Sequence, residues 1–147
     1  MTFLVAYDGS PLAKSALLRA AEFEPTVDDV LHVVTVVPAD GDLARERGWL
    51  DPAETFSRQG ITDDVEREVA DFVDDAVVHC RFAEKYAPRG RLTRMIRTVA
   101  DELDASVLFV GSESAGRLVS GLASVGQGVA YGEYDLHVVR RPHPALA

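Results

Sequence analysis

Apolar runs and amphipathic runs alternate along this chain of 147 residues. The apolar runs predict strands, which we place at residues 3–7, 31–37, 107–110 and 136–139, with a weaker one at 81–86. Apolar positions three or four residues apart predict helices, which we place at residues 11–23, 62–80, 92–103 and 120–131. Strands that alternate with such helices require right-handed crossovers and a parallel sheet covered on both sides. We therefore expect an α/β fold in which residues 1–147 form a single domain around an open five-stranded parallel sheet.

The segments between these elements carry signals of their own. Ser10 suits the N-terminal cap of the first helix, and Thr62 suits that of the second. Residues 39–60 show no clear period, so we expect a long irregular loop there. Trp49 either anchors that loop over a ligand cleft or packs against a second copy of the chain. Residues 141–147 are expected to form a short C-terminal tail.

A predicted strand runs into a Gly/Ser loop and then toward a predicted helix at residues 106–124, SVLFVGSESAGRLVSGLAS. The backbone N–H groups of such a loop converge, and the helix adds the positive end of its dipole, so the motif favours a bound phosphate. In open parallel sheets, ligands bind beyond the carboxyl ends of the strands. Asp8, Val36 and Gly111 all lie at such ends in the predicted fold. The pattern therefore predicts an anion site at this edge of the sheet.

The charge balance excludes several classes of partner. The chain has 24 acidic and 15 basic residues, a formal net charge of −9. Such a chain repels nucleic acid and anionic membrane surfaces, so we expect neither as a partner. Only Lys14 and Lys85 are lysines, and we interpret this acidic composition as that of a protein from a high-salt cytoplasm.

Other kinds of chemistry lack a motif in this sequence. There is no run of about 20 apolar residues and no basic region before the first apolar run, so we expect a soluble, cytoplasmic protein. The four histidines and Cys80 show no metal-ligand spacing, so no metal site is expected. The loop serines lack the G-x-S-x-G pattern, so we expect no catalytic residues. Taken alone, Asp8 is explained by an ordinary Asp-Gly-Ser turn.

Four segments resemble the universal stress protein family: VAYDGS at residues 5–10, LHVVTVVPADG at 31–41, VLFVGSESAGRLVSGLASV at 107–125 and LHVVRR at 136–141. The resemblance covers essentially the whole chain. It implies a flavodoxin-like or Rossmann-like sheet of the adenine nucleotide alpha-hydrolase-like superfamily. It also implies that Asp8 faces an adenosine, that the backbone at Val36 meets the adenine, and that the loop from Gly111 onward holds the phosphates.

The loop differs from the G-x-x-G-x(9)-G-[ST] pattern of the family. In the alignment that we prefer, Ser114 stands at the second glycine and Ala123 at the third. Ser124 is then the phosphate-contacting serine, followed by Val125, and one residue is deleted before them. A Cβ at a position that needs a positive φ or close approach to phosphate adds strain and bulk. Two of the three glycines are lost in this alignment.

A second alignment uses Gly116 and Gly126 as the glycines, with an insertion, and it places Gln127 where the pattern has serine or threonine. Either alignment predicts that ATP, with Mg²⁺, binds weakly or not at all. We expect no other cofactor.

The resemblance implies a non-catalytic regulatory module of the stress response that acts through an unknown protein partner. An ATP- or AMP-binding switch is the first alternative, and a slow nucleotide hydrolase is the second. The family commonly pairs through its last strand, and a β-branched edge strand favours such pairing, so we expect a homodimer. In that strand, Leu136 and Val138 should share one face, and His137 and Val139 the other.

Overall fold

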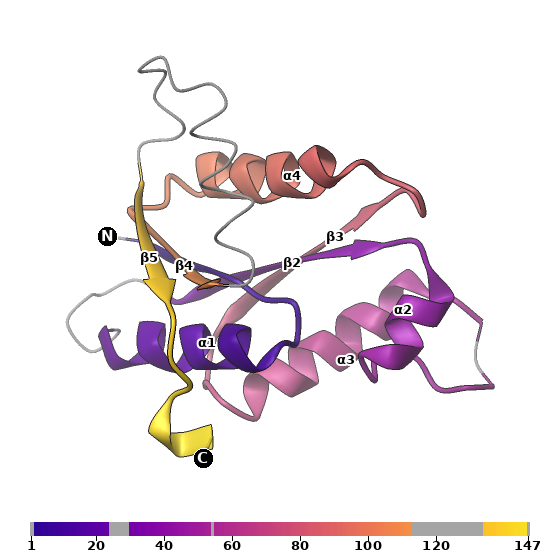
Figure 1. The fold of residues 1–147 in the computed structure, drawn as a ribbon, viewed down its shortest axis with the longest axis horizontal. Helices are drawn as coiled ribbons and strands as arrows, with labels where there is room; N and C mark the ends of the chain where they lie inside the picture. The colour runs from indigo at the N-terminus through magenta and orange to yellow at the C-terminus, as the bar shows by residue number, and fades with distance from the viewer. Residues whose placement is uncertain (1, 24–29, 54, 113–133, 147) are drawn as a thin grey trace.

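A computed structural model describes residues 2–23, 30–53, 55–112 and 134–146 of the chain (Figure 1). Its strands are β1 (Phe3–Ala6), β2 (His32–Pro38), β3 (Val77–Ala83), β4 (Val107–Gly111) and β5 (Asp135–Val139). Its α-helices are α1 (Pro11–Phe23), α2 (Gly41–Glu46), α3 (Arg58–Ala70) and α4 (Arg89–Glu102), and a short 3₁₀ helix follows at Pro144–Leu146. The predicted helix at residues 120–131 lies outside the described residues.

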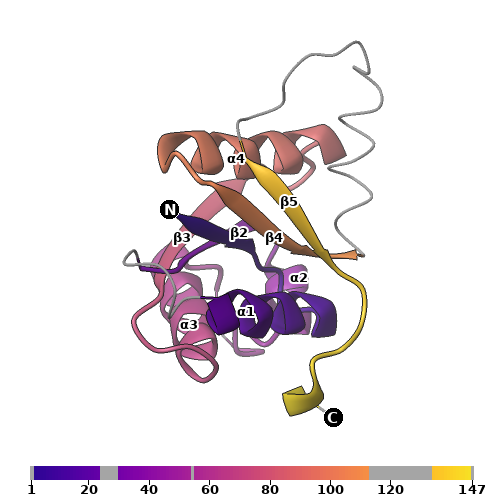
Figure 2. The ribbon, with the colours of Figure 1, turned by 90° about the vertical axis from the view of Figure 1, so that its left-hand side faces the viewer.

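The strands form one parallel sheet in the order β3-β2-β1-β4-β5. Helix α4 lies on one face of the sheet, and α1 and α3 lie on the other (Figures 1 and 2). The strand order reverses between β1 and β4, which is where open α/β sheets leave a crevice beyond the strand ends. The structure thus confirms the predicted α/β class, the five parallel strands and the helices on both faces.

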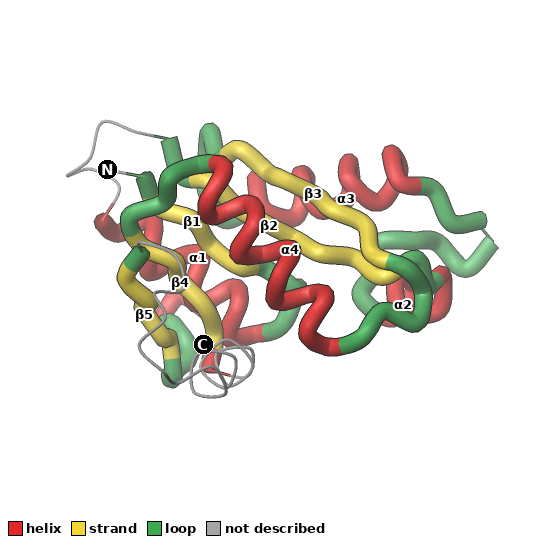
Figure 3. The backbone as a smooth tube through the Cα atoms, turned by 90° about the horizontal axis from the view of Figure 1, so that it is seen from above, coloured by secondary structure: helices red, strands yellow, loops and turns green. Residues whose placement is uncertain are grey.

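Successive side chains along the strands point to opposite faces of the sheet and pack into two separate hydrophobic cores. Val5, Val33 and Val37 point toward α1 and α3 and belong to the larger core, which also contains Trp49 and Ile61. On the other side, a smaller core is formed by residues of the sheet and of α4, namely Leu4, Val34, Val99, Ala100, Leu108 and Val110. Among the helices that the structure describes, Figure 3 shows α4 alone over this side of the sheet. We call the two sides the three-helix face, covered by α1, α2 and α3, and the α4 face.

The predicted cap of the first helix is confirmed. Ser10 precedes α1, and its hydroxyl oxygen accepts a hydrogen bond from the backbone N–H of Ala13 at 3.2 Å. Pro11 is the first helical residue, where its missing N–H removes no intrahelical bond.

The expectation of an irregular loop over residues 39–60 is wrong, because helix α2 lies within it and α3 begins at Arg58. Asp40 caps α2 by accepting from the backbone N–H groups of Asp42 and Leu43. The helix ends at Glu46 with Arg47 as its cap, and Gly48 follows with a φ of +78°, which is unfavourable for other residues. A polar cap and a terminal glycine are the sequence signals of a helix, but six residues are too few for a visible apolar period.

The predicted helix over residues 62–80 is also wrong in its extent. Helix α3 is capped by Ser57 instead of Thr62, and it ends at Ala70. A turn follows in which Asp75 has a φ of 62°, and β3 then begins at Val77, before the predicted strand at 81–86. Asp tolerates this left-handed conformation better than most residues, which lets the chain reverse there. Cys80 therefore lies in a strand, where burial raises the pKa of its thiol.

The C-terminal end of the chain returns to the three-helix face. In β5, His137 stacks on Phe109 of β4, and Val139 belongs to the larger core, whereas Leu136 and Val138 pack on the smaller core. This confirms the predicted alternation of faces in β5. Beyond the strand, the backbone N–H of His143 donates to the Ser15 hydroxyl at 2.9 Å. No helix among the described residues is both long enough and apolar enough to cross a bilayer.

Candidate functional site

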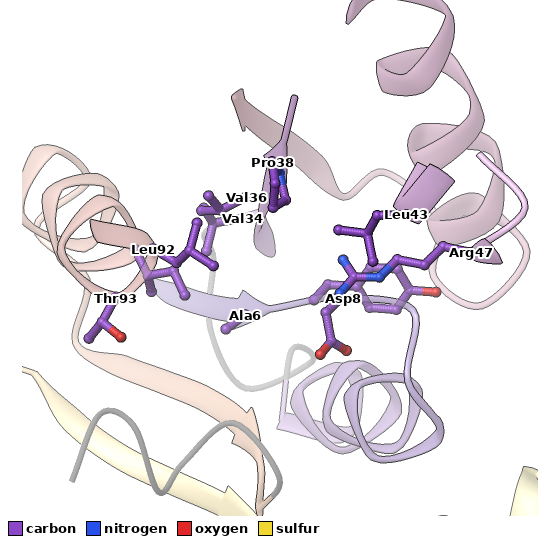
Figure 4. Close-up of a pocket in the computed structure, with 11 residues that line it drawn as sticks. Ala6, Asp8, Val34, Val36, Pro38, Leu43, Arg47, Leu92 and Thr93 are labelled. Atoms are coloured by element: carbon purple, nitrogen blue, oxygen red, sulfur yellow. The ribbon is translucent and has the colours of Figure 1, made fainter. Parts of the chain in front are cut away.

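A pocket of about 170 Å³ opens beside the carboxyl ends of β1 and β2, under the first turns of α4 (Figure 4). The residues that line it come from β1 and the turn after it, from β2, from α2 and from α4: Ala6, Tyr7, Asp8, Val34, Val36, Pro38, Leu43, Arg47, Leu92, Thr93 and Ile96. The pocket therefore lies at the edge of the sheet where the sequence predicts a ligand.

Most of the lining is apolar. Val34 and Val36 of β2 form one wall, and Leu92 of α4 faces them (Figure 4). Ile96 of α4 also lines the pocket. An apolar slot between a strand and a helix suits a flat ring system, which loses contact with water on both of its sides. The few polar groups around the slot can then fix the orientation of a ligand.

Asp8 is one of these polar groups, and it also stabilises the turn after β1. Its Oδ1 accepts a hydrogen bond from the backbone N–H of Ser10 at 2.9 Å. This bond is the ordinary turn contact that Asp-Gly-Ser predicts. The same carboxylate lines the pocket, where it offers an acceptor to hydroxyl or amine donors of a ligand.

A polar network centred on Glu68 holds the segments that carry Tyr7 and Trp49. The Glu68 carboxylate of α3 accepts from the Tyr7 hydroxyl and, at 3.1 Å, from the indole N–H of Trp49. Tyr7 and Trp49 are both almost completely buried, with exposed fractions of 2% and 1%. Burial, followed by the bond to Glu68, raises the pKa of Tyr7, so its hydroxyl remains a donor.

Gly9 brings this network against the turn that carries Asp8. Its φ is +82°, and a Cβ at this position would lie 3.3 Å from Cζ2 of Trp49. Glycine is therefore required both for the backbone conformation and for the close approach of the indole. Trp49 thus anchors its segment beside the pocket, which was one of the two alternatives that the sequence left open for it.

Gly111 has a packing role that the sequence did not reveal. It ends β4 and lies against the first turn of α1, where a Cβ would stand 2.8 Å from Leu12 Cβ and 3.0 Å from the Leu12 carbonyl carbon. Gly111 does not line the described pocket. The other residues predicted for the phosphate loop, Ser114, Gly116, Ser124 and Val125, lie outside the described residues.

Of the predicted ligand-binding residues, the structure brings Asp8 and Val36 together in one pocket. Sequence reasoning missed Arg47, Leu43 and Thr93, which join them there. Recognition of Asp40 and Gly48 as the ends of a helix would have placed Leu43 and Arg47 on a defined element. No local pattern marks Thr93, because its position depends on how α4 lies over β2.

A second polar pair lies on the α4 face, nearer the amino ends of the strands. His32 Nδ1 of β2 and His79 Nε2 of β3 are 2.9 Å apart, and their rings are stacked. Burial, then the charges of His32 and Arg81, lower the pKa of His79. In the described part of the chain, no three His, Cys, Asp or Glu side chains are grouped in a way that could hold a metal ion.

Comparison with known proteins identifies the family. The family model of the universal stress protein family matches residues 1–131. The chain belongs to the universal stress protein family. No curated protein matches it in sequence.

Solved structures of this family share the fold. A universal stress protein in complex with cAMP is 22% identical, with 95% of this chain and 97% of that one covered and a TM-score of 0.55. A universal stress protein from Archaeoglobus fulgidus DSM 4304 is 21% identical; the match covers 96% of this chain and 44% of that one, with a TM-score of 0.56. A protein of the universal stress protein family from Burkholderia pseudomallei is 19% identical; the match covers 95% of this chain and 96% of that one, with a TM-score of 0.56. This chain therefore spans less than half of the Archaeoglobus protein and nearly all of the other two.

Proposed function

We propose that this universal stress protein is a non-catalytic regulatory module whose pocket binds the adenosine part of a nucleotide. The observation that carries the proposal is the apolar slot with Asp8 at its edge, beside the carboxyl ends of β1 and β2. A structural neighbour was solved in complex with cAMP, which supports an adenine nucleotide as the class of ligand. In this role, occupancy of the pocket alters the surface offered to a protein partner.

The lining residues suggest how adenosine is held. The adenine ring fits between Val36 and the α4 side chains Leu92 and Ile96, which exclude water from both of its faces. The ribose hydroxyls then donate to the Asp8 carboxylate, whose Oδ1 already accepts from Ser10 and whose position is thereby fixed. The adenosine part of the ligand is thus bound by residues that do not belong to the phosphate loop.

The phosphate part of the ligand is bound less well. Ser114 and Ala123 stand where the family pattern has glycine, and a Cβ at either position obstructs close approach of the backbone to a phosphate. No P-loop lysine follows the loop to stabilise a γ-phosphate, so the proposed role includes no hydrolysis.

Calorimetric titration with adenosine and with Mg-ATP tests the proposal. We expect Mg-ATP to bind more weakly than about 100 μM, because its triphosphate gains little from the loop. We also expect no release of phosphate from ATP during prolonged incubation. Low-micromolar binding of ATP would show a nucleotide switch instead, and steady turnover would show a hydrolase.

A double substitution separates the two parts of the ligand. Ser114→Gly with Ala123→Gly should raise the affinity for ATP by about tenfold or more and leave that for adenosine unchanged, because it removes two Cβ atoms from the loop. The matched control makes the same chemical changes elsewhere in this stretch, with Ser120→Gly and Ala130→Gly. An equal gain in both double variants would mean that glycine acts by general loosening of the chain.

We also propose that the protein is a homodimer paired through β5. This strand lies at the edge of the sheet, and among the described strands it pairs only with β4. An edge with Leu136, Val138 and Val139 favours pairing with a second copy. Light scattering at micromolar concentration should give twice the mass of the chain, and Val138→Pro should reduce it to that of one chain. A single-chain mass for the unmodified protein would rule out the dimer.

A further inference from the structure

Arg47 gives the pocket a positive charge that the phosphate loop does not supply. It lies at the end of α2 and is one of the residues that line the pocket. Figure 4 shows its side chain extending from α2 toward Asp8. The guanidinium and the carboxylate thus approach the same space from α2 and from the turn after β1.

Both the backbone and the side chain of Arg47 are positioned by contacts with neighbouring residues. Its backbone N–H bonds to the carbonyl oxygens of Leu43 and Arg45, which fixes it as the C-terminal cap of α2. Two residues later the chain is anchored by Trp49, and the guanidinium carbon of Arg47 lies 5.2 Å from the centre of the Trp49 ring. A guanidinium stacked on a buried ring loses little further freedom when a ligand binds.

Trp49 connects the two charged residues of the pocket. The same indole lies against Gly9, next to Asp8, and under the guanidinium of Arg47. Its own N–H is bonded to Glu68, so the ring cannot shift without loss of that bond. One buried side chain thus touches both the turn that carries Asp8 and the guanidinium of Arg47.

The charge of Arg47 is available to a ligand. Five other arginines pair with carboxylates within 4.0 Å, namely Arg19, Arg45, Arg67, Arg81 and Arg91. Among the described residues Arg47 is in no such pair, although Asp8 lines the same pocket. A guanidinium presents two parallel N–H donors, which match two oxygens of a phosphate.

We propose that Arg47 binds the phosphate of an adenine nucleotide at the α2 side of the pocket, so that the site selects a nucleoside monophosphate over the nucleoside. This proposal rests on the proposed function, because it takes adenosine as the occupant of the slot. Asp8 and Arg47 then contact neighbouring groups of one ligand, a ribose hydroxyl and a phosphate. A phosphate held there lies close to the ribose and does not depend on the loop after β4.

Titration of the full chain with adenosine, 5′-AMP, 3′-AMP and cAMP tests this assignment. In the unmodified protein at least one of the three phosphorylated ligands should bind about tenfold more tightly than adenosine, the effect of a charge-assisted contact. Arg47→Gln should remove that advantage and leave the affinity for adenosine within a factor of two. The advantage should also shrink as KCl is raised, whereas adenosine binding should change little.

Arg58→Gln is the matched control. Arg58 also lies over an aromatic ring, with its guanidinium carbon 5.4 Å from the centre of Phe82, and it does not line the pocket. This variant should keep the full advantage of the phosphorylated ligands. If Arg47→Gln instead leaves every ratio between nucleotide and adenosine unchanged, Arg47 does not bind phosphate and the assignment is wrong. If the unmodified protein binds none of the four ligands, the proposed function itself fails.

Discussion

The two faces of the sheet are covered to different depths. On the three-helix face, helices α1, α2 and α3 enclose a large core that contains Leu17, Trp49 and Ile61. On the α4 face, α4 is the one described helix, the core formed by the described residues is smaller, and the pocket lies at one end of it. The pocket therefore lies on the face that fewer of the described helices cover, and its walls come from β1 with the turn after it, from β2, α2 and α4.

Polar groups follow the same division. On the three-helix side, Tyr7 and Trp49 donate to Glu68, so that their polar atoms are satisfied within the protein. Asp8 follows Tyr7 in the chain, and Arg47 precedes Trp49 by two residues. Asp8 and Arg47 are thus each close in sequence to a residue whose side chain is hydrogen-bonded on the three-helix face. Contacts on the three-helix face therefore hold the chain segments from which Asp8 and Arg47 reach the pocket.

Trp49→Ala should have the largest effect, because it removes the side chain that connects the two faces. We expect the free energy of unfolding to fall by about 3–5 kcal/mol, as for other fully buried tryptophans. Urea denaturation measures this loss, and calorimetry should show weaker adenosine binding, since Asp8 and Arg47 lose their common support.

Ile96→Ala provides the comparison on the α4 face. Ile96 is half-buried at the pocket, so its truncation should cost less, about 1–2 kcal/mol. Equal losses for Trp49→Ala and Ile96→Ala would contradict the view that the three-helix face carries most of the stability.

Two glycine substitutions, one at the end of β4 and one in α4, should change the free energy of unfolding by smaller amounts and in opposite directions. Gly111→Ala adds a Cβ that would stand 3.0 Å from the backbone of Leu12, and we expect it to lower the free energy of unfolding by about 1–3 kcal/mol. Gly90→Ala in α4 meets no atom within 4 Å and should raise stability by up to about 1 kcal/mol, because alanine favours the helix.

Thermal and urea unfolding of the two glycine variants give the sign of each effect. Adenosine affinity should be unchanged in both, since neither glycine lines the pocket. A stable Gly111→Ala protein with weakened ATP binding would instead give Gly111 the phosphate role that the family resemblance implies.

Much of the fold could be predicted from the sequence because its signals are local. The apolar runs gave four of the strands to within a residue or two, and Ser10 with Pro11 marked the start of α1. The predicted helix that reached Cys80 failed because Ala76 and Cys80 happen to continue the helical period of α3. In the structure the helix ends at Ala70 and the chain turns at Asp75, where aspartate tolerates the left-handed conformation, but an aspartate in the sequence does not by itself mark such a turn.

The site was less predictable, because its residues meet through long-range contacts. Asp8 and Val36 could be found, since both lie at the ends of predicted strands. Arg47 could not, because its position depends on the bond between Trp49 and Glu68, which are 19 residues apart in sequence. The role of Gly111 depends in the same way on how closely β4 approaches Leu12.

The histidine pair on the α4 face should produce the smallest effect, a loss of stability in weak acid. His79 has a pKa below its usual value of 6.5 in the folded chain, first because of burial and then because of His32 and Arg81. The unfolded chain therefore binds a proton more readily, so stability is full above about pH 6.5 and falls as the pH drops below that value. Glu102 of α4 opposes this shift only in part.

Urea midpoints at pH 7, 6 and 5 measure the fall. His79→Gln should flatten part of this profile, because it removes the titrating ring and its 2.9 Å contact with His32. His137→Gln is the control, since His137 stacks on Phe109 at the opposite end of the sheet. Its profile should keep the slope of the unmodified protein. If His79→Gln retains that slope as well, protonation of the pair has no effect on folding, and the α4 face differs from the other face in packing only.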